Sequence, residues 1–215
     1  PGNIREVYGL TECGISTCLH CAAHPDKWES VGLPTEGAQV RVIDDQGHEL
    51  PQGEIGEIVG RAISMMRGYV NRPEQTAEML WTSPEGEVFY RSGDMGRIDE
   101  DGFIYILDRR NDMIISGGFN IYAVDLEQAL LGHPAVADAA VIGIPSDHWG
   151  ETPLGLVVRK PDHNDSDSEA SILEWANARL GKSQRLAAIE VRDELPRSTI
   201  GKILKRELRA PYWSK

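Results

Sequence analysis

The spacing of apolar residues changes near residue 110, and this change constrains the fold more than any other feature of the sequence. Between residues 38 and 61, apolar and polar residues alternate around Asp-Gln-Gly and Pro-Gln-Gly turn sequences, which predicts a β-meander. Residues 73–80 begin with a proline at a favourable first helical position and predict a short helix. Residues 87–98 and 102–109 flank an Asp-Glu-Asp-Gly turn and predict a β-hairpin.

After Arg110, helical and extended patterns follow one another. The predicted order is helix, strand, strand, helix, strand and helix, over residues 124–131, 136–145, 152–160, 168–180, 186–193 and 201–209. The polar run at residues 160–169 is predicted to be a solvated loop. These patterns predict an α+β fold with one domain over residues 1–110 and a second over residues 111–215.

The charge of the chain argues against nucleic acid as a general partner. Its 34 acidic and 22 basic residues give a net charge of −12, which repels phosphate backbones and anionic lipid. No apolar run has the length needed to cross a bilayer. Three cysteines do not make a secreted disulfide framework, so a cytoplasmic location is expected. The chain starts with Pro1 and shows no targeting pattern, which suggests a fragment of a longer protein.

The cysteines lie close together in the sequence, and a metal site must be considered. Cys13, Cys18, Cys21 and His24 include one pair with the short spacing that grips zinc. No second well-spaced pair follows, so small apolar side chains without a metal are the favoured interpretation.

Four short motifs carry a resemblance to a known family. They are YGLTE at residues 8–12, YRSGD at 90–94, DRRNDMIISGGFNI at 108–121 and PRSTIGK at 196–202. In this order they resemble the AMP-forming acyl-CoA synthetases, within the superfamily that also holds adenylation domains and luciferases. The resemblance spans essentially the whole chain. It implies the end of a large nucleotide-binding domain with a β-meander or barrel-like subdomain, followed by a small, mobile α+β domain.

The resemblance also implies a ligase reaction in two steps. A fatty or other organic acid reacts with ATP, in the presence of Mg²⁺, to give an acyl-adenylate and pyrophosphate, and the thiol of CoA then displaces AMP. Tyr8 beside Gly9 can offer a flat face to adenine while the backbone approaches the nucleotide. By resemblance, Thr11 binds the α-phosphate and Glu12 helps to hold Mg²⁺, a cation that prefers oxygen ligands. The alternatives are a half-buried strand tyrosine and an exposed acid.

Two further residues are assigned to the ribose by the same resemblance. Asp94 has the acceptor oxygens that ribose hydroxyls require, and Arg109 has a planar fork of donors that fits neighbouring oxygens. The alternative interpretations are a turn aspartate and a surface cation at a strand end.

The third motif contains the expected hinge and the expected CoA contact. Asn111 falls at the hinge, where the family usually has aspartate or lysine, so electrostatic control of the hinge is not expected. Gly117 and Gly118 allow the backbone to line a narrow tunnel for the pantetheine arm of CoA, although a tight bend would also use them. Ile115 and Phe119 replace a lysine and a glutamate that are common in the family.

The fourth motif places Lys202 after Gly201 at the predicted start of a helix. By resemblance, this lysine contacts the substrate carboxylate and the α-phosphate during adenylation. A solvent-facing lysine at a helix start is the alternative. The motif also resembles a target of protein acetyltransferases, which would remove the charge of Lys202.

The sequence contains no Ser/Thr/Gly-rich phosphate loop of the family type, so little or no turnover is expected from this chain alone. Two alternatives remain beside the acyl-CoA ligase. One is an adenylation domain that loads a carrier protein, and the other is a noncatalytic interaction or regulatory fragment.

Overall fold

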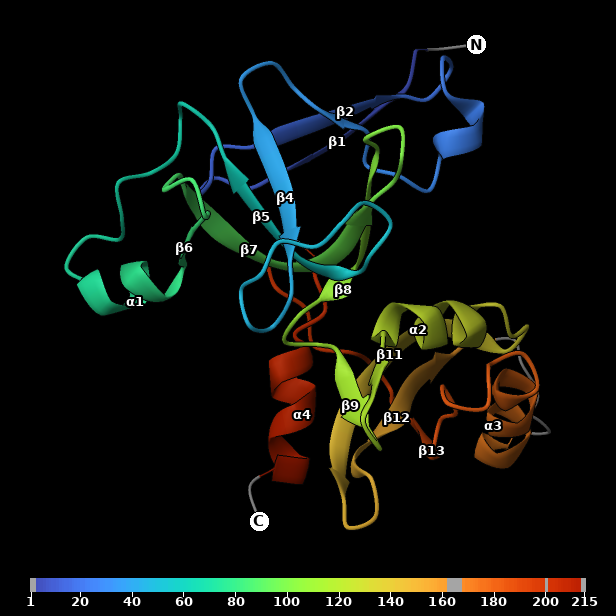
Figure 1. Ribbon diagram of the computed structural model, residues 1–215. Helices are drawn as coiled ribbons and strands as arrows, with labels where there is room; N and C mark the ends of the chain where they lie inside the picture. The colour runs from blue at the N-terminus through green and yellow to red at the C-terminus, as the bar shows by residue number, and fades with distance from the viewer. Residues whose placement is uncertain (1–2, 162–167, 200, 214–215) are drawn as a thin grey trace. The chain divides into compact units, whose positions relative to one another are not determined.

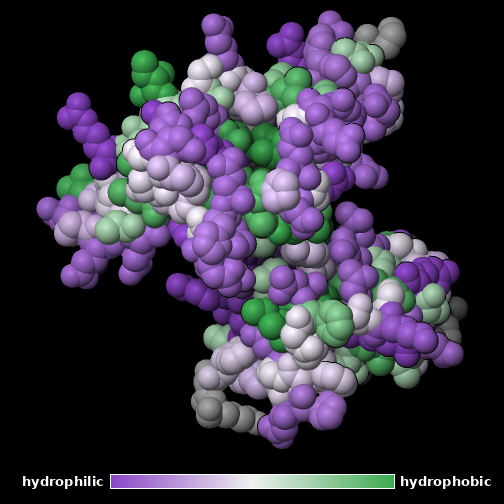
Figure 2. Space-filling view, viewed as in Figure 1, coloured by the Kyte–Doolittle hydropathy of each residue, from purple (hydrophilic) through white to green (hydrophobic). Residues whose placement is uncertain are grey.

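The computed structural model describes residues 3–161, 168–199 and 201–213, and the chain divides into two compact units, Pro1–Arg110 and Asn111–Lys215 (Figure 1). Helices and strands occur in both units, so the predicted α+β class is confirmed. Figure 2 shows hydrophilic side chains over much of the visible surface. No helix within the described ranges is long and apolar enough to cross a membrane.

The first unit consists mainly of strands. Its described elements are β1 (Arg5–Gly9), β2 (Ser16–His20), the 3-10 helix η1 (Pro25–Lys27), β3 (Leu33–Pro34), β4 (Gln39–Ile43), β5 (Gly56–Arg61), α1 (Pro73–Glu78), β6 (Leu80–Thr82), β7 (Val88–Ile98) and β8 (Ile104–Arg109). One sheet has the strand order β1-β2-β3. The other has the order β4-β5-β7-β6, and β8 pairs with β7.

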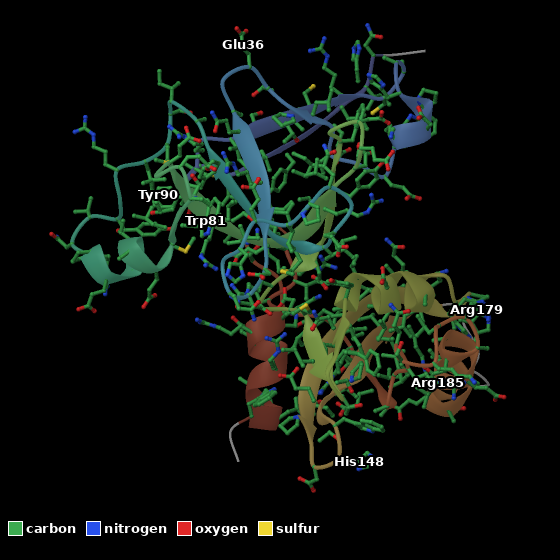
Figure 3. The ribbon with its side chains drawn as sticks, viewed as in Figure 1. Glu36, Trp81, Tyr90, His148, Arg179 and Arg185 are labelled. Carbon is green, nitrogen blue, oxygen red and sulfur yellow. The ribbon has the colours of Figure 1, made fainter. Side chains whose placement is uncertain are left out.

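The hairpin of β7 and β8 is antiparallel, as predicted, and aligns Asp94 with Arg109. Its turn is organised by Asp99, whose Oδ1 accepts hydrogen bonds from the backbone N–H groups of Asp101 at 3.0 Å and Phe103 at 2.9 Å. An aspartate that bonds the backbone ahead of it stabilises such a turn. The larger sheet has a core of buried side chains that includes Trp81 and Phe89. Figure 3 labels Trp81 and Tyr90 in this region.

The second unit has a mixed sheet with helices on both faces. Its described elements are β9 (Ile114–Ser116), β10 (Phe119–Ile121), α2 (Ala123–Leu131), β11 (Val136–Ser146), β12 (Gly150–Arg159), α3 (Glu169–Asn177), β13 (Ala188–Val191) and α4 (Lys205–Trp213). The strand order is β10-β9-β12-β11, and β13 pairs in parallel with β12.

Alternation along β11 assigns the helices to opposite faces of this sheet. Ala139 and Val141 belong to the cluster that contains buried residues of α2 and α3. Ala140 and Ile142 belong to a separate cluster, against which Leu208 and Tyr212 of α4 pack. Successive side chains of a strand point to opposite faces, so α2 and α3 cover one face and α4 covers the other (Figure 1).

Two predicted helix boundaries are wrong. The first helix ends at Glu78, and Leu80 belongs to β6. The sequence pattern predicts a helix from Gly201, whereas α4 begins at Lys205 and extends to Trp213. Backbone hydrogen bonds within residues 196–204 hold the preceding segment in a loop, for example Leu204 N to Pro196 O at 2.8 Å. Most of the predicted loop at residues 160–169 lies outside the described residues.

Candidate functional site

Tyr8, Asp94 and Arg109 form one polar cluster in the first unit. The Tyr8 hydroxyl donates a hydrogen bond to Asp94 Oδ2 at 2.6 Å. Arg109 Nε lies 2.8 Å from Asp94 Oδ1, and the Asp94 side chain is only 4% exposed. A buried carboxylate requires such donors because an unpaired buried charge is costly. The structure therefore brings together three residues that the motifs assign to the nucleotide.

Asp94 keeps acceptor capacity in this cluster. A carboxylate has about four lone-pair positions, and Tyr8 and Arg109 use one on each oxygen. Burial, followed by the hydrogen bond to Asp94, raises the pKa of Tyr8 well above its ordinary value. Tyr8 thus stays protonated and donates its proton to Asp94, while its ring is half-buried at the end of β1. The cluster can accept further hydroxyl groups beside an aromatic ring.

The turn after β1 carries Thr11 and Glu12. Thr11 is exposed, and the Tyr69 hydroxyl donates a hydrogen bond to Glu12 Oε1 at 2.9 Å. This hydrogen bond raises the pKa of Tyr69, and burial adds to the effect. Gly9 has a structural reason to be glycine, because a Cβ there would lie 2.8 Å from the carbonyl oxygen of Ile15. Tyr69 was missed by sequence reasoning because it lies outside the four motifs.

The donor set of this turn suits one kind of magnesium site. Within the described residues, no three His, Cys, Asp or Glu side chains come together to hold a metal ion. Mg²⁺ often takes one or two carboxylates and completes its shell with water and substrate phosphates. Glu12 fits that role as a single carboxylate ligand. Cys13, Cys18 and Cys21 are free thiols and are not assembled into a zinc site.

Lys202 lies in the loop before α4 rather than in its first turn, which corrects the predicted helix start. Ser198 N donates to Lys202 O at 2.8 Å, and Lys202 N donates to Ser198 Oγ at 3.1 Å. The residue is exposed, and its side chain has no hydrogen-bond or ion-pair partner among the described residues. The ammonium group is therefore available to a ligand.

Gly117 and Gly118 form the two-residue turn between β9 and β10. Their φ angles of 58° and 83° match a turn in which both central residues need positive φ. A Cβ on Gly117 would lie 2.6 Å from Trp149 Cε3, whereas a Cβ on Gly118 would meet nothing within 4 Å. The tight bend explains both glycines, and the open space beside Gly118 leaves room for a ligand.

A groove of about 380 Å³ adjoins this turn. It is lined by Ser116, Phe119, Ile121, Trp149, Thr152, Lys182, Ser183 and Arg185. Trp149 follows His148, which Figure 3 labels at the tip between β11 and β12, and Arg185 is labelled near α3. Aromatic rings, hydroxyls and cations together suit a ligand with a ring and anionic groups. Sequence reasoning missed the groove because its residues come from separate segments.

Asn111 lies at the division between the two units. Before it, Arg110 Nη1 lies 2.6 Å from the buried Glu57 carboxylate, and Arg110 N donates to Gly93 O at 2.8 Å. After it, Arg209 donates to Asn111 O at 2.8 Å and contacts Asp112 at 3.3 Å. Each neighbour of Asn111 is thus bonded within its own unit. The role of Asn111 as a hinge stays a prediction.

Comparison with known proteins gives a consistent family. Residues 1–70 match the family described as AMP-binding enzyme, and residues 125–202 match the AMP-binding enzyme C-terminal domain. The 4-coumarate–CoA ligase-like 9 protein of Oryza sativa subsp. japonica is 37% identical over 99% of this chain and 38% of its own length. The fatty acid–[acyl-carrier-protein] ligase ScoC of Streptomyces coeruleorubidus is 37% identical over 97% of this chain and 40% of its own length.

A solved structure agrees with these relatives. ATP-bound MatB from Rhodopseudomonas palustris matches with a TM-score of 0.84 and 34% identity, over 97% of this chain and 40% of that chain. The chain therefore spans about two fifths of the length of the relatives it matches. The two family matches, the relatives and the order of the four motifs agree, and the chain belongs to the AMP-forming acyl-CoA synthetase and adenylation family.

Proposed function

We propose that the protein to which this chain belongs activates a carboxylic acid with ATP and transfers the acyl group to the thiol of CoA. The observation that carries the proposal is the buried Asp94 carboxylate held between Tyr8 and Arg109. Its remaining lone pairs suit the hydroxyl groups of a ribose. The Tyr8 ring supplies a face for adenine, and the Arg109 side chain, 56% exposed, has donors left for nucleotide oxygens.

In the first step, an oxygen of the substrate carboxylate attacks the α-phosphorus of ATP. The bond from this phosphorus to the bridging oxygen breaks, and pyrophosphate leaves with the electron pair. The Lys202 ammonium stabilises the negative charge on the reacting groups, and the Thr11 hydroxyl donates to an α-phosphate oxygen. Glu12 supplies one carboxylate oxygen to Mg²⁺, which neutralises phosphate charge when it is bound.

In the second step, the CoA thiol loses its proton to solvent and its sulfur attacks the acyl carbonyl carbon; the bond from that carbon to the phosphate oxygen breaks, and AMP leaves with the electron pair. The turn at Gly117 and Gly118 lets the pantetheine arm approach the backbone. Lys182 and Arg185, which line the adjoining groove, supply positive charge for the phosphates of CoA. Because Lys202 and the glycine turn serve successive steps from one unit, the proposal includes a rotation at Asn111 between the steps.

A second acceptor is supported by one relative. ScoC is named as a ligase of fatty acids to acyl-carrier protein and is as identical to this chain as the rice protein. A carrier protein presents its thiol on the same kind of pantetheine arm, so the adenylation step would be unchanged.

The experiment uses the protein at its complete length. Exchange of labelled pyrophosphate into ATP, measured with a panel of carboxylic acids, tests for adenylation. Release of AMP is then measured with CoA and, separately, with a pantetheinylated carrier protein. Acid-dependent exchange followed by CoA-dependent AMP release is expected. Exchange without response to CoA, but with response to the carrier protein, would favour the second acceptor. Absence of exchange with every acid would contradict the proposed function.

A further inference from the structure

The loop that carries Lys202 is bonded to itself at several points. Leu204 N donates to Pro196 O at 2.8 Å, and Gly201 N donates to Ser198 O at 2.9 Å. An isolated antiparallel bridge joins Arg197 and Ile203 across the loop. The described residues of this loop thus form a closed unit whose ends lie side by side, although Lys202 itself is exposed.

Arg197 connects this loop to the sheet. One nitrogen of its guanidinium, Nη1, donates to the carbonyl oxygen of Gly201 at 2.6 Å, and Nη2 donates to Asp138 Oδ2 on β11. The carbonyl that it holds belongs to the residue immediately before Lys202. A planar guanidinium can hold two acceptors in fixed directions, which the single ammonium of a lysine does less well.

A second ion pair fixes the other end of the loop. Lys205 Nζ, at the first residue of α4, lies 2.8 Å from Glu127 Oε1, and both side chains are mostly buried. The same oxygen accepts a hydrogen bond from Val141 N of β11 at 2.8 Å. The loop is therefore attached to β11 on both sides of Lys202. Arg197 binds Asp138 of β11, and Lys205 binds Glu127, which in turn bonds the backbone of β11.

We infer that Arg197, held by Asp138, is a positioning residue for Lys202. The lysine side chain is long and flexible, so fixing it at the reacting groups costs conformational entropy. A mobile loop would add the entropy cost of ordering its backbone. By fixing the Gly201 carbonyl, Arg197 sets the direction in which the following residue leaves the loop. This inference rests on the proposed role of Lys202 in adenylation.

Because the ion pair of Arg197 and Asp138 is partly exposed, a positioning role of Arg197 can be distinguished from a role in stability. The side chains of Arg197 and Asp138 are 44% and 29% exposed, and exposed ion pairs contribute little to folding. Loss of the guanidinium is thus expected to loosen the loop and leave the fold intact. Arg192 is a matched control, because its side chain is 43% exposed and pairs with Glu190 at 2.6 Å in the same unit.

The first test measures the two half-reactions in the complete protein for Arg197→Ala, Arg197→Lys, Asp138→Asn and Arg192→Ala, beside Lys202→Ala. Arg197→Ala is expected to lower kcat for ATP–pyrophosphate exchange about tenfold, with a smaller change in KM for ATP. Arg197→Lys and Asp138→Asn should fall between this variant and the unchanged protein. Thioester formation from supplied acyl-adenylate should keep its rate in all of them, and Arg192→Ala should match the unchanged protein in both assays.

The second test needs no activity and uses the 215-residue chain. Hydrogen exchange of the amides of Gly201 and Lys202 is expected to accelerate in Arg197→Ala and not in Arg192→Ala, while protection of β11 and β12 persists. If Lys202→Ala impairs pyrophosphate exchange but Arg197→Ala does not, the inference is overturned and the proposed function stands. Equal loss in both half-reactions by Arg197→Ala would also overturn it, since that is the result of general destabilisation. If Lys202→Ala leaves exchange intact, the proposed role of Lys202 fails and this inference fails with it, while the proposed adenylation stands.

Discussion

The Tyr8 hydroxyl donates to Asp94 Oδ2 at 2.6 Å although 86 positions of the chain separate the two residues. Arg109 completes the surroundings of this carboxylate from the neighbouring strand. The position of each group depends on the others, because removal of one donor leaves a buried acceptor unpaired, which costs about 1–3 kcal/mol.

Asp94→Asn is expected to weaken nucleotide use in the complete protein. The amide replaces one acceptor oxygen by an NH₂ group, which cannot accept from a ribose hydroxyl and opposes Arg109. KM for ATP in pyrophosphate exchange should rise by about tenfold or more, since each lost charge-assisted hydrogen bond contributes on that order. Asp45→Asn is the control, because Asp45 is exposed and pairs only with Arg110 at 3.0 Å among the described contacts. An unchanged KM for ATP in Asp94→Asn would contradict the ribose assignment.

Tyr8→Phe separates the ring of Tyr8 from its hydroxyl. Phenylalanine keeps the aromatic face and removes the donor to Asp94, so a smaller loss than in Tyr8→Ala is expected if the ring supports adenine. The measurement is the affinity for AMP by calorimetry in the complete protein. Equal losses in the two variants would show that the hydroxyl, and not the ring, accounts for the role of Tyr8.

Lys202→Ala is expected to lower adenylate formation by about a hundredfold and to spare thioester formation from supplied acyl-adenylate. The side chain is exposed, so the fold should not change. Lys182→Ala provides a control for the adenylation step alone: Lys182 is also exposed but lines the groove beside the glycine turn, so its loss should leave pyrophosphate exchange unchanged. Equal losses in both half-reactions would indicate that Lys202 has a structural role. Acetylation of Lys202, which removes the same charge, stays a prediction, and its expected effect is the same pattern.

Gly118 is the better of the two glycines for testing CoA access. A side chain at Gly117 would collide with Trp149, whereas Gly118 faces open space. Gly118→Asn keeps a residue that tolerates positive φ, and Gly118→Leu adds bulk at the same place. The leucine variant should lose thioester formation far more than the asparagine variant, and both should retain pyrophosphate exchange. Normal CoA kinetics in a folded leucine variant would rule out the predicted approach of CoA to this turn.

Arg185→Glu is expected to raise KM for CoA several-fold without a change in pyrophosphate exchange, because it reverses a charge that lines the groove. Arg179→Glu is the control. Arg179 lies over the Trp175 ring at 3.5 Å and does not line the groove, although Figure 3 shows both arginines near α3. An equal effect of the two variants would point to the net charge of the unit and not to a binding groove.

The strands of the meander, the hairpin and the second unit, and most helices, could be predicted because their signals are local. The hairpin of β7 and β8 follows from alternation on either side of the turn at Asp99, and α2 follows from the spacing of Leu126 and Leu130. The start of α4 was predicted wrongly because residues 201–204 have a helical pattern but use their backbone groups within the loop. A local pattern does not report such competition between hydrogen-bond partners.

The candidate site was predicted only where motifs of the family identify it. Tyr8, Asp94 and Arg109 came from three motifs, and no periodicity indicates that they meet. In two contacts, only one partner lies in a motif. Tyr69 contacts Glu12, 57 positions away, and Asp138 contacts Arg197, 59 positions away, but neither Tyr69 nor Asp138 belongs to a motif. Such pairs depend on how sheets and loops pack, so the structure was needed to find them.

The bonds on either side of Asn111 each lie within one unit, and they define which torsions a rotation at Asn111 would use. Arg110 is fixed to Glu57 and Gly93, while the Asn111 carbonyl and Asp112 are fixed to Arg209. With those bonds intact, the torsions left free are ψ of Arg110 and φ and ψ of Asn111, since peptide planes do not rotate. The proposed rotation at Asn111 would use these three torsions and would leave the named bonds within each unit in place.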